Sequence, residues 1–179
     1  MSYADVSAAE FVKAYVRDVP DFPKPGILFK DITPVLAHPR GLTTIIEAFA
    51  GRFENSEIDV VVAVESRGFL FGAPLAERLG VGFVPVRKPG KLPYKTRKIA
   101  YALEYGEGHL EIHEDAITQG ARVVIVDDLL ATGGTAKAAS DLVKAQGGDV
   151  FAFAFVIELE FLDGRGKLGD ARVESIVRY

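Results

Sequence analysis

The sequence predicts an α/β fold in which helices flank a doubly wound, mostly parallel β-sheet. Three observations lead to this prediction. Four short, almost wholly apolar runs have the length of buried strands, at residues 59–64, 81–86, 122–126 and 150–157. Helix-length segments separate the first run from the second and the third from the fourth, so the order strand, helix, strand occurs twice. Strands that are apolar throughout are typical of parallel sheets covered on both faces.

The length of the chain, 179 residues, is that of one ordinary domain. We find no internal repeat or Ser/Gly linker, so we expect residues 1–179 to form a single domain. Cysteine is absent, which excludes disulfides and thiolate metal sites and fits a reducing compartment. No apolar run approaches membrane-spanning length, and residues 1–10 lack the features of a signal peptide. We therefore expect a cytoplasmic protein with no membrane partner.

Charge is unevenly distributed along the chain. The net charge of −4 argues against a protein whose main partner is nucleic acid. Residues 87–98 nevertheless contain six Lys or Arg and no acid. This basic block is either a solvated loop or one wall of a site for an anion.

The N-terminal third is expected to contain two helices separated by an irregular segment. Residues 7–16 predict a short helix, and residues 41–53 have apolar side chains at helical spacing. Four prolines between residues 19 and 34 exclude a long regular element there.

The middle of the chain begins with a strand at 59–64, followed by a helix at 72–79 that ends at Gly80 and a strand at 81–86. Residues 88–97 are polar and contain Pro and Gly, which predicts a loop. Two short strands at 99–105 and 110–113 are expected to pair with each other.

The last part contains a strand at 122–126, a helix at 135–146 and a strand at 150–157. In the final strand, phenylalanines alternate with other residues, so they are expected to share one face in the core: Phe151, Phe153 and Phe155. The three histidines, His38, His109 and His113, do not have the spacing of metal ligands.

The strongest functional signal follows the strand at 122–126, because ligands of such sheets bind beyond the carboxyl ends of strands. Two acids come first, and a turn with two glycines and two hydroxyls then opens a helix: Asp127, Asp128, Ala131, Thr132, Gly133, Gly134 and Thr135. Glycines let backbone N–H groups approach an anion, and a helix N-terminus adds free donors. The pattern favours a sugar phosphate, with the acids facing sugar hydroxyls, over a tight turn with two solvated acids.

The turn is not a nucleoside-triphosphate loop, since it has no lysine. It resembles the signature of the type I phosphoribosyltransferases, which bind 5-phosphoribosyl-1-pyrophosphate (PRPP). The resemblance covers nearly the whole chain and is greatest to adenine-specific members of that family. It rests on five ordered blocks, at residues 21–34, 65–72, 87–93, 103–106 and 127–135.

The resemblance implies the type I phosphoribosyltransferase fold, with a small N-terminal hood at residues 1–34 and a flexible catalytic loop at residues 87–106. It implies that Asp127 and Asp128 contact the ribose hydroxyls and that the turn at residues 131–135 holds the 5-phosphate. It assigns the segment Glu65, Ser66 and Arg67 to pyrophosphate, with a cis peptide between the first two. The alternative is that Arg67 is a surface arginine paired with Glu65.

The loop is expected to neutralise the leaving pyrophosphate through Arg87, Lys88 and Lys91 and to close over the substrate as a lid. The resemblance places the catalytic glutamate at Glu104, next to Tyr105. The alternative is a surface glutamate on a β-ribbon.

Base-binding positions of the family correspond to Leu28, Lys30 and Leu159. Adenine-specific relatives often have arginine where this chain has Lys30, and the two side chains are not equivalent at a flat contact. Simple core packing is the alternative for Leu28.

We therefore expect transfer of phosphoribose from PRPP to adenine, which yields AMP and pyrophosphate. Mg²⁺ would be carried mainly by the substrate, with no metal ligands from the protein, and the resemblance suggests a homodimer. Two alternatives remain open: a transferase for hypoxanthine, guanine, xanthine or orotate, and a PRPP-sensing regulator without catalysis.

Overall fold

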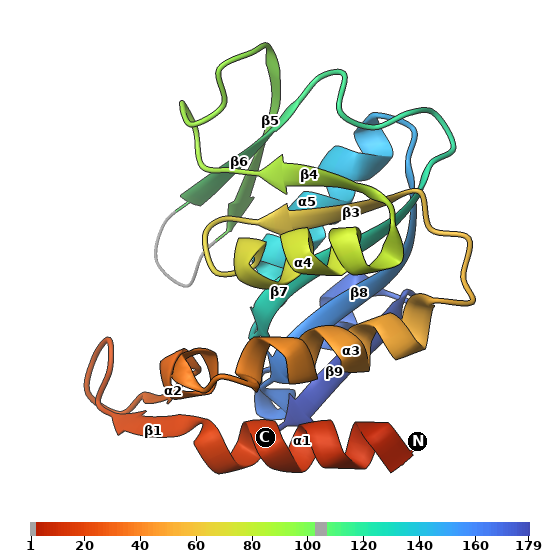
Figure 1. Cartoon of the computed structure of the whole chain (residues 1–179). Helices are drawn as coiled ribbons and strands as arrows, with labels where there is room; N and C mark the ends of the chain where they lie inside the picture. The colour runs from red at the N-terminus through yellow and green to blue at the C-terminus, as the bar shows by residue number, and fades with distance from the viewer. Residues whose placement is uncertain (1–2, 103–106) are drawn as a thin grey trace.

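The computed structural model describes residues 3–102 and 107–179. Its centre is a five-stranded sheet with the strand order β4-β3-β7-β8-β9, in which every neighbouring pair is parallel (Figure 1). The strands of this sheet are β3 (Val60–Val64), β4 (Gly82–Val86), β7 (Arg122–Leu130), β8 (Asp149–Glu158) and β9 (Arg172–Arg178). The prediction of a doubly wound parallel sheet is confirmed.

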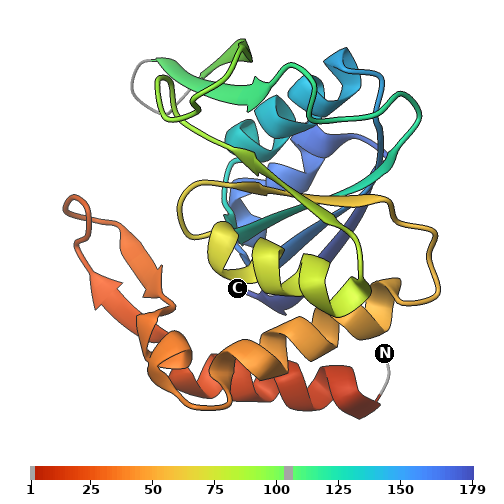
Figure 2. The same cartoon turned by 45° about the horizontal axis from the view of Figure 1, so that its top comes forward.

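Helices cover both faces of the sheet, as Figure 2 shows. One face carries α1 (Tyr3–Tyr15), α3 (Gly41–Phe53) and α4 (Phe69–Leu79), and the other carries α5 (Gly134–Ala145). Alternate residues of β3 explain the two layers, because Val61 belongs to the core under α3 and α4 while Val62 belongs to the core under α5. The continuous apolar strands thus fill two hydrophobic cores.

The three phenylalanines of β8 do not share one face, so that expectation was wrong. Phe153 and Phe155 stack at 6.2 Å in the core under α5, whereas Phe151 packs against the opposite core. The register explains the difference: Val123 pairs with Val150 but Val124 pairs with Ala152, so Phe151 is an extra residue. A bulge of this kind reverses the side-chain alternation on one side of the inserted residue.

The N-terminal segment extends from the sheet as a separate arm (Figures 1 and 2). It contains an antiparallel pair, β1 (Arg17–Pro20) and β2 (Leu28–Asp31), followed by the short helix α2 (Thr33–Ala37). The prolines exclude a long element, as expected, but they leave room for these short ones.

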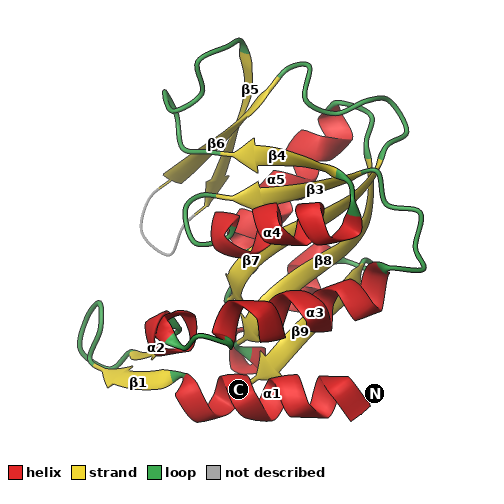
Figure 3. Ribbon diagram, in the orientation of Figure 1, coloured by secondary structure: helices red, strands yellow, loops and turns green. Residues whose placement is uncertain are grey.

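A second antiparallel ribbon, β5 (Thr96–Ala102) and β6 (Glu107–His113), lies beside α5 (Figure 3). The predicted pairing of these two strands is confirmed. Nη1 of Arg97 donates a hydrogen bond of 2.9 Å to the carbonyl of Ala145 at the end of α5. This contact anchors one end of the ribbon on the helix.

Several boundaries differ from the prediction. Helix α4 begins at Phe69 instead of residue 72, and β7 continues to Leu130. The prediction missed β9 and the 3₁₀ turns η1 (Glu160–Leu162) and η2 (Gly164–Leu168) that lead to it. Within the described ranges, no helix is both long and apolar enough to cross a membrane.

Candidate active site

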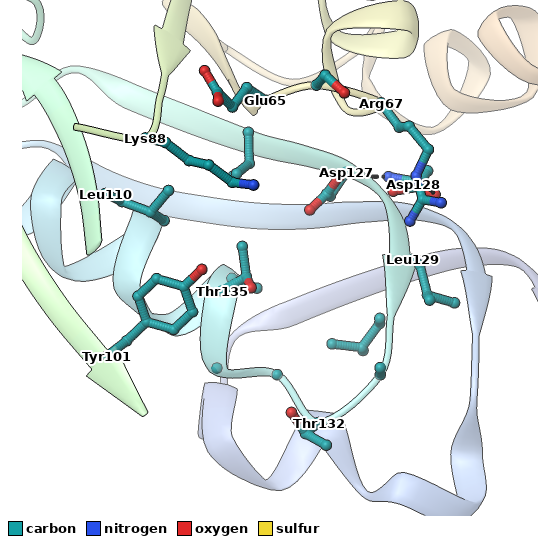
Figure 4. A pocket seen from close by; sticks show the side chains of 17 residues that line it. Glu65, Arg67, Lys88, Tyr101, Leu110, Asp127, Asp128, Leu129, Thr132 and Thr135 are labelled. Carbon is teal, nitrogen blue, oxygen red and sulfur yellow. Dashed lines mark hydrogen bonds and ion pairs between the residues drawn. The ribbon is translucent and has the colours of Figure 1, made fainter. Parts of the chain in front are cut away.

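A cavity of about 500 Å³ lies at the carboxyl ends of β3 and β7, where the fold places ligand sites (Figure 4). Eleven of the residues singled out in the sequence line it: Glu65, Ser66, Arg67, Lys88, Asp127, Asp128, Ala131, Thr132, Gly133, Gly134 and Thr135. The topology thus brings together three segments that are far apart in the chain.

The two acids lie within β7, not after it. Strand β3 pairs with β7 only as far as Val126, whereas β8 continues to pair with it up to Leu130. Beyond Val126, the side of β7 that faced β3 is therefore unpaired. Asp127 and Asp128 occupy this open stretch, which is why they line the cavity although the strand continues past them.

The two carboxylates have different surroundings. Asp128 is buried, and its Oδ2 lies 2.8 Å from Nε of Arg67. Asp127 lines the cavity, and its Oδ1 accepts a hydrogen bond of 2.9 Å from the Asp128 amide. Burial, and then the adjacent charge of Asp128, raise the pKa of Asp127 well above its usual range. One acid is thus paired with an arginine, while the raised pKa of the other favours its neutral form.

Gly68 explains how the start of α4 comes close to the ends of β3 and β7. A Cβ at Gly68 would lie 2.5 Å from the Val64 carbonyl oxygen, 2.9 Å from that of Val126 and 3.0 Å from Oδ1 of Asp127. Only a residue without a side chain fits between the two strand ends. The close approach brings Arg67 beside Asp128.

The glycine turn leads into α5 without a side-chain cap. Gly133 has a φ of 77°, which is the left-handed region, and no side chain accepts from the first amides of the helix. The first N–H groups of a helix have no partner within the helix, so they remain available to a ligand. Thr135 lies in the first turn and lines the cavity. The turn is an anion-binding geometry.

The Glu65–Ser66 peptide is cis, as the family resemblance implies. Arg87 is not directed at the cavity: its Nε lies 2.6 Å from Oε2 of Glu65, and its Nη1 donates 3.0 Å to the Lys91 carbonyl. The alternative pairing of Arg67 with Glu65 is therefore not observed, because each has another partner. Lys88 points into the cavity (Figure 4) and forms no ion pair with another described residue.

The structure does not bring the base-binding candidates to this cavity. Leu28 is exposed on the hairpin, and Leu159 is buried, with its amide donating to the Leu130 carbonyl at 2.9 Å. Nζ of Lys30 lies 2.6 Å from Asp18 and 4.1 Å from the centre of the Tyr179 ring. Lys91 is also exposed and lies outside the cavity lining. Glu104 and Tyr105 fall outside the described residues.

The sequence reasoning missed six residues that line the cavity: Val64, Tyr101, Leu110, Leu129, Leu130 and Ala136. Tyr101 projects from β5 toward the glycine turn (Figure 4). Its ring lies against Gly108, its partner in the ribbon, where a Cβ would be 2.7 Å from Cζ. The second strand of the predicted hairpin began only at residue 110, so Gly108 lay in the predicted turn and no sequence signal pointed to Tyr101.

Fold and site together define a class: an α/β protein that binds a phosphorylated sugar at the carboxyl ends of its strands. Residues 31–171 match the family described as phosphoribosyl transferase domain. An adenine phosphoribosyltransferase of Sorangium cellulosum is 60% identical over 177 residues, which is 96% of this chain and 88% of that protein. One from Anaeromyxobacter dehalogenans is 56% identical and covers 94% of this chain and 98% of its own length.

Solved structures agree with these sequence comparisons. The adenine phosphoribosyltransferase of Thermoanaerobacter pseudethanolicus superposes with a TM-score of 0.92 at 56% identity, covering 96% of this chain and 99% of its own. The Saccharomyces cerevisiae protein, solved with an imino-altritol bisphosphate and adenine, has a TM-score of 0.90 at 46% identity, with 96% and 99% covered. The chain belongs to the adenine phosphoribosyltransferase family.

Proposed function

We propose that the protein transfers the 5-phosphoribosyl group of PRPP to adenine, which gives AMP and pyrophosphate in purine salvage. The observation that carries this proposal is the order of groups along the cavity. Lys88 and Arg67 lie on one side of the cavity, the glycine turn at the N-terminus of α5 lies on the other, and Asp127 and Asp128 lie between them (Figure 4). This order fits the pyrophosphate, 5-phosphate and ribose of PRPP.

The 5-phosphate is assigned to the turn of residues 131–135. The free amides at the start of α5 donate to its oxygens, and the positive end of the helix dipole favours its charge. The hydroxyls of Thr132 and Thr135 add donors from the same turn. No positively charged side chain is needed in the turn itself.

Asp127 and Asp128 are assigned to the ribose. An ionised carboxylate accepts hydrogen bonds more strongly than a protonated carboxyl group and at both oxygens, so ribose hydroxyls that donate to Asp127 favour its charged form. Arg67 keeps Asp128 in place through their 2.8 Å contact. The pair fixes the sugar ring while its C1 acquires positive character.

The pyrophosphate is assigned to the segment Glu65, Ser66 and Arg67 and to the basic residues of the loop. Lys88 points into the cavity and stabilises the charge that develops as pyrophosphate leaves. Arg87 and Lys91 lie on the loop beside it, where closure of residues 87–106 would bring Lys91 toward the site. Closure also excludes water from the reactive sugar carbon.

Mg²⁺ is assigned to the substrate more than to the protein. Within residues 3–102 and 107–179, no three His, Asp or Glu side chains are grouped so that they could hold a metal. Asp127 and Asp128 could contribute at most one or two ligands beside a metal bound by phosphate oxygens. A bound Mg²⁺ would supply charge neutralisation at the pyrophosphate.

The base is assigned to the hood. Leu28 offers an exposed aliphatic surface on the arm that extends from the sheet, and Lys30 and Leu159 are proposed to flank the purine. Glu104, next to Tyr105, is the proposed group that handles the proton of the base nitrogen. The hood at residues 1–34 and the loop are proposed as parts of one domain, residues 1–179.

We also propose that the enzyme is a cytoplasmic homodimer that binds neither nucleic acid nor membrane. Size-exclusion chromatography with light scattering tests the dimer, and fractionation of the source cells tests the compartment. A monomer in solution would remove the dimer from the proposal without affecting the chemistry.

The decisive experiment is an assay of the purified protein with PRPP, Mg²⁺ and a panel of bases: adenine, hypoxanthine, guanine, xanthine and orotate. We expect product only with adenine, as AMP and pyrophosphate in equal amounts. Turnover with another base would change only the base assigned as the substrate and leave the rest of the proposal in place. Binding of PRPP without any product would favour the regulator instead.

A further inference from the structure

We propose that Gly164 and the Arg165–Glu158 pair form a rigid support beneath the glycine turn and act as positioning residues for the 5-phosphate. This inference rests on the proposed function, since it concerns the same turn. None of these residues lines the cavity. They would act through the backbone of residues 131–133.

The first observation is a close contact between two backbones. A Cβ at Gly133 would lie 2.4 Å from the Gly164 carbonyl oxygen, and one at Gly164 would lie 2.3 Å from the Ala131 carbonyl oxygen. Both positions therefore require glycine, and η2 lies directly against the turn. Gly133 also has a positive φ of 77°, a backbone conformation that favours glycine.

The second observation is the ion pair that follows Gly164. Arg165 Nη2 donates to Oε2 of Glu158 at 2.8 Å, and its Nε contacts Oε1 of the same carboxylate. Arg165 Nη1 donates to the Val173 carbonyl at 3.1 Å, and Ser175 Oγ donates to Glu158 at 2.5 Å. One bidentate arginine thus joins η2, β8 and β9.

The charge state of Glu158 agrees with this role. Its side chain is only 4% exposed, and burial by itself would raise its pKa. Hydrogen bonds from Arg165 and Ser175 outweigh burial and hold the pKa of Glu158 below its usual value. The carboxylate therefore stays ionised and paired at the pH of the reaction.

The support acts on the same strand end that leads into the turn. Glu158 is opposite Leu130 in the register of β7 and β8, and the Leu159 amide donates to the Leu130 carbonyl at 2.9 Å. The turn is thus held from two sides, by β8 at Leu130 and by Gly164 at Gly133. A shift of η2 would move the amides that meet the phosphate, while the hood would stay in place.

The test compares Gly164→Ala and Arg165→Lys with two controls. Gly51→Ala places a Cβ in open space on α3, and Arg78→Lys alters the exposed pair with Glu47 at 2.8 Å. Each variant is assayed for KM of PRPP, KM of adenine and kcat, and for ribose 5-phosphate binding by calorimetry. We expect KM for PRPP and Kd for ribose 5-phosphate to rise about 10- to 100-fold in G164A. A smaller rise is expected in R165K, with KM for adenine and both controls near wild type.

Equal increases in KM for PRPP and KM for adenine, or an unchanged KM for PRPP, would overturn the proposal that these residues position the turn. R165K keeps the charge but cannot hold both carboxylate oxygens and the Val173 carbonyl, so it decides the question even when G164A does not fold. If wild-type protein makes no AMP yet binds ribose 5-phosphate, the proposed function fails and the calorimetry still tests the support.

Discussion

Nε of Arg67 lies 2.8 Å from Oδ2 of Asp128, so the residue proposed for pyrophosphate holds the residue proposed for ribose. The side chain of Asp128 is 9% exposed and that of Arg67 is 45% exposed. The arginine therefore has its Nε committed to a buried carboxyl group, while nearly half of its side chain remains exposed at the cavity. Loss of either side chain should affect both parts of the substrate.

Arg67→Gln should lower kcat/KM for PRPP about 100-fold or more, because it removes a donor from the leaving group and leaves Asp128 without its counter-charge. Steady-state kinetics with PRPP varied at saturating adenine measures the effect. Arg78→Gln, which removes the exposed pair with Glu47, is the matched control. An Arg67→Gln enzyme with wild-type kcat/KM would remove this arginine from the site.

Affinity for ribose 5-phosphate should rise with pH through the pKa of Asp127. Burial and the charge of Asp128 raise this pKa in the unliganded protein, whereas ribose hydroxyls favour the carboxylate, so binding releases a proton. Calorimetry in two buffers of different ionisation enthalpy counts the released protons. The phosphate of the ligand also titrates, but its contribution is the same for the wild-type protein and for Asp127→Asn. The variant should therefore release fewer protons on binding than the wild type does. Equal release by the two proteins would contradict the prediction.

The same raised pKa has a consequence for stability. The contribution of neutral Asp127 is fully present below the pKa of an unfolded aspartate, near 3.9, and is lost as pH rises through the higher folded value. At pH 8 the unliganded Asp127→Asn variant should therefore have a higher Tm than wild type, despite weaker binding of ribose 5-phosphate. Thermal unfolding without ligand checks the higher Tm of the variant, and unfolding with ribose 5-phosphate checks its weaker stabilisation by the ligand. A lower Tm for the unliganded variant would contradict this account.

Tyr101→Phe should raise KM for PRPP about 10-fold and leave KM for adenine unchanged. The Tyr101 hydroxyl points toward the turn in Figure 4, and a hydrogen bond to a charged phosphate is worth about 1.5–3 kcal/mol. Tyr94→Phe serves as the control, since Tyr94 is 56% exposed on the loop outside the cavity lining. Identical kinetics in the two variants would exclude a contact from Tyr101.

Glu104→Gln should reduce kcat about 100-fold or more with little change in KM for PRPP, because a proton-transfer group acts mainly in the transition state. Glu107→Gln, which alters a residue of β6 that is paired with His109 at 3.0 Å, is the control. Unchanged turnover in Glu104→Gln would remove this residue from the mechanism.

The sequence was most informative where one physical rule dominates. The helix at residues 41–53 was predicted with its observed bounds, because its apolar periodicity has no interruption. Strand β9 was missed because Glu174 and Ser175 interrupt its apolar pattern. Ser175 is nevertheless buried, where it donates to Glu158, and that partner is 17 residues away in the chain. No local pattern could reveal this pairing.

The site was predictable to the extent that the ends of parallel strands meet at one edge. That rule located Asp127, Asp128 and the glycine turn. It could not locate Tyr101, which comes from a ribbon outside the sheet, or the packing of Gly164 beneath Gly133. Both depend on how distant segments pack, not on where a strand ends.

The hairpin of β1 and β2 forms a sheet of its own, apart from the five strands that carry the acids and the turn. None of residues 17–31 belongs to either hydrophobic core, so substitutions on this hairpin can accumulate without disturbing the cores. Under the proposed roles, evolution could retarget such an enzyme to a different nucleobase by rewriting the hairpin of β1 and β2 while inheriting the sugar-phosphate machinery intact.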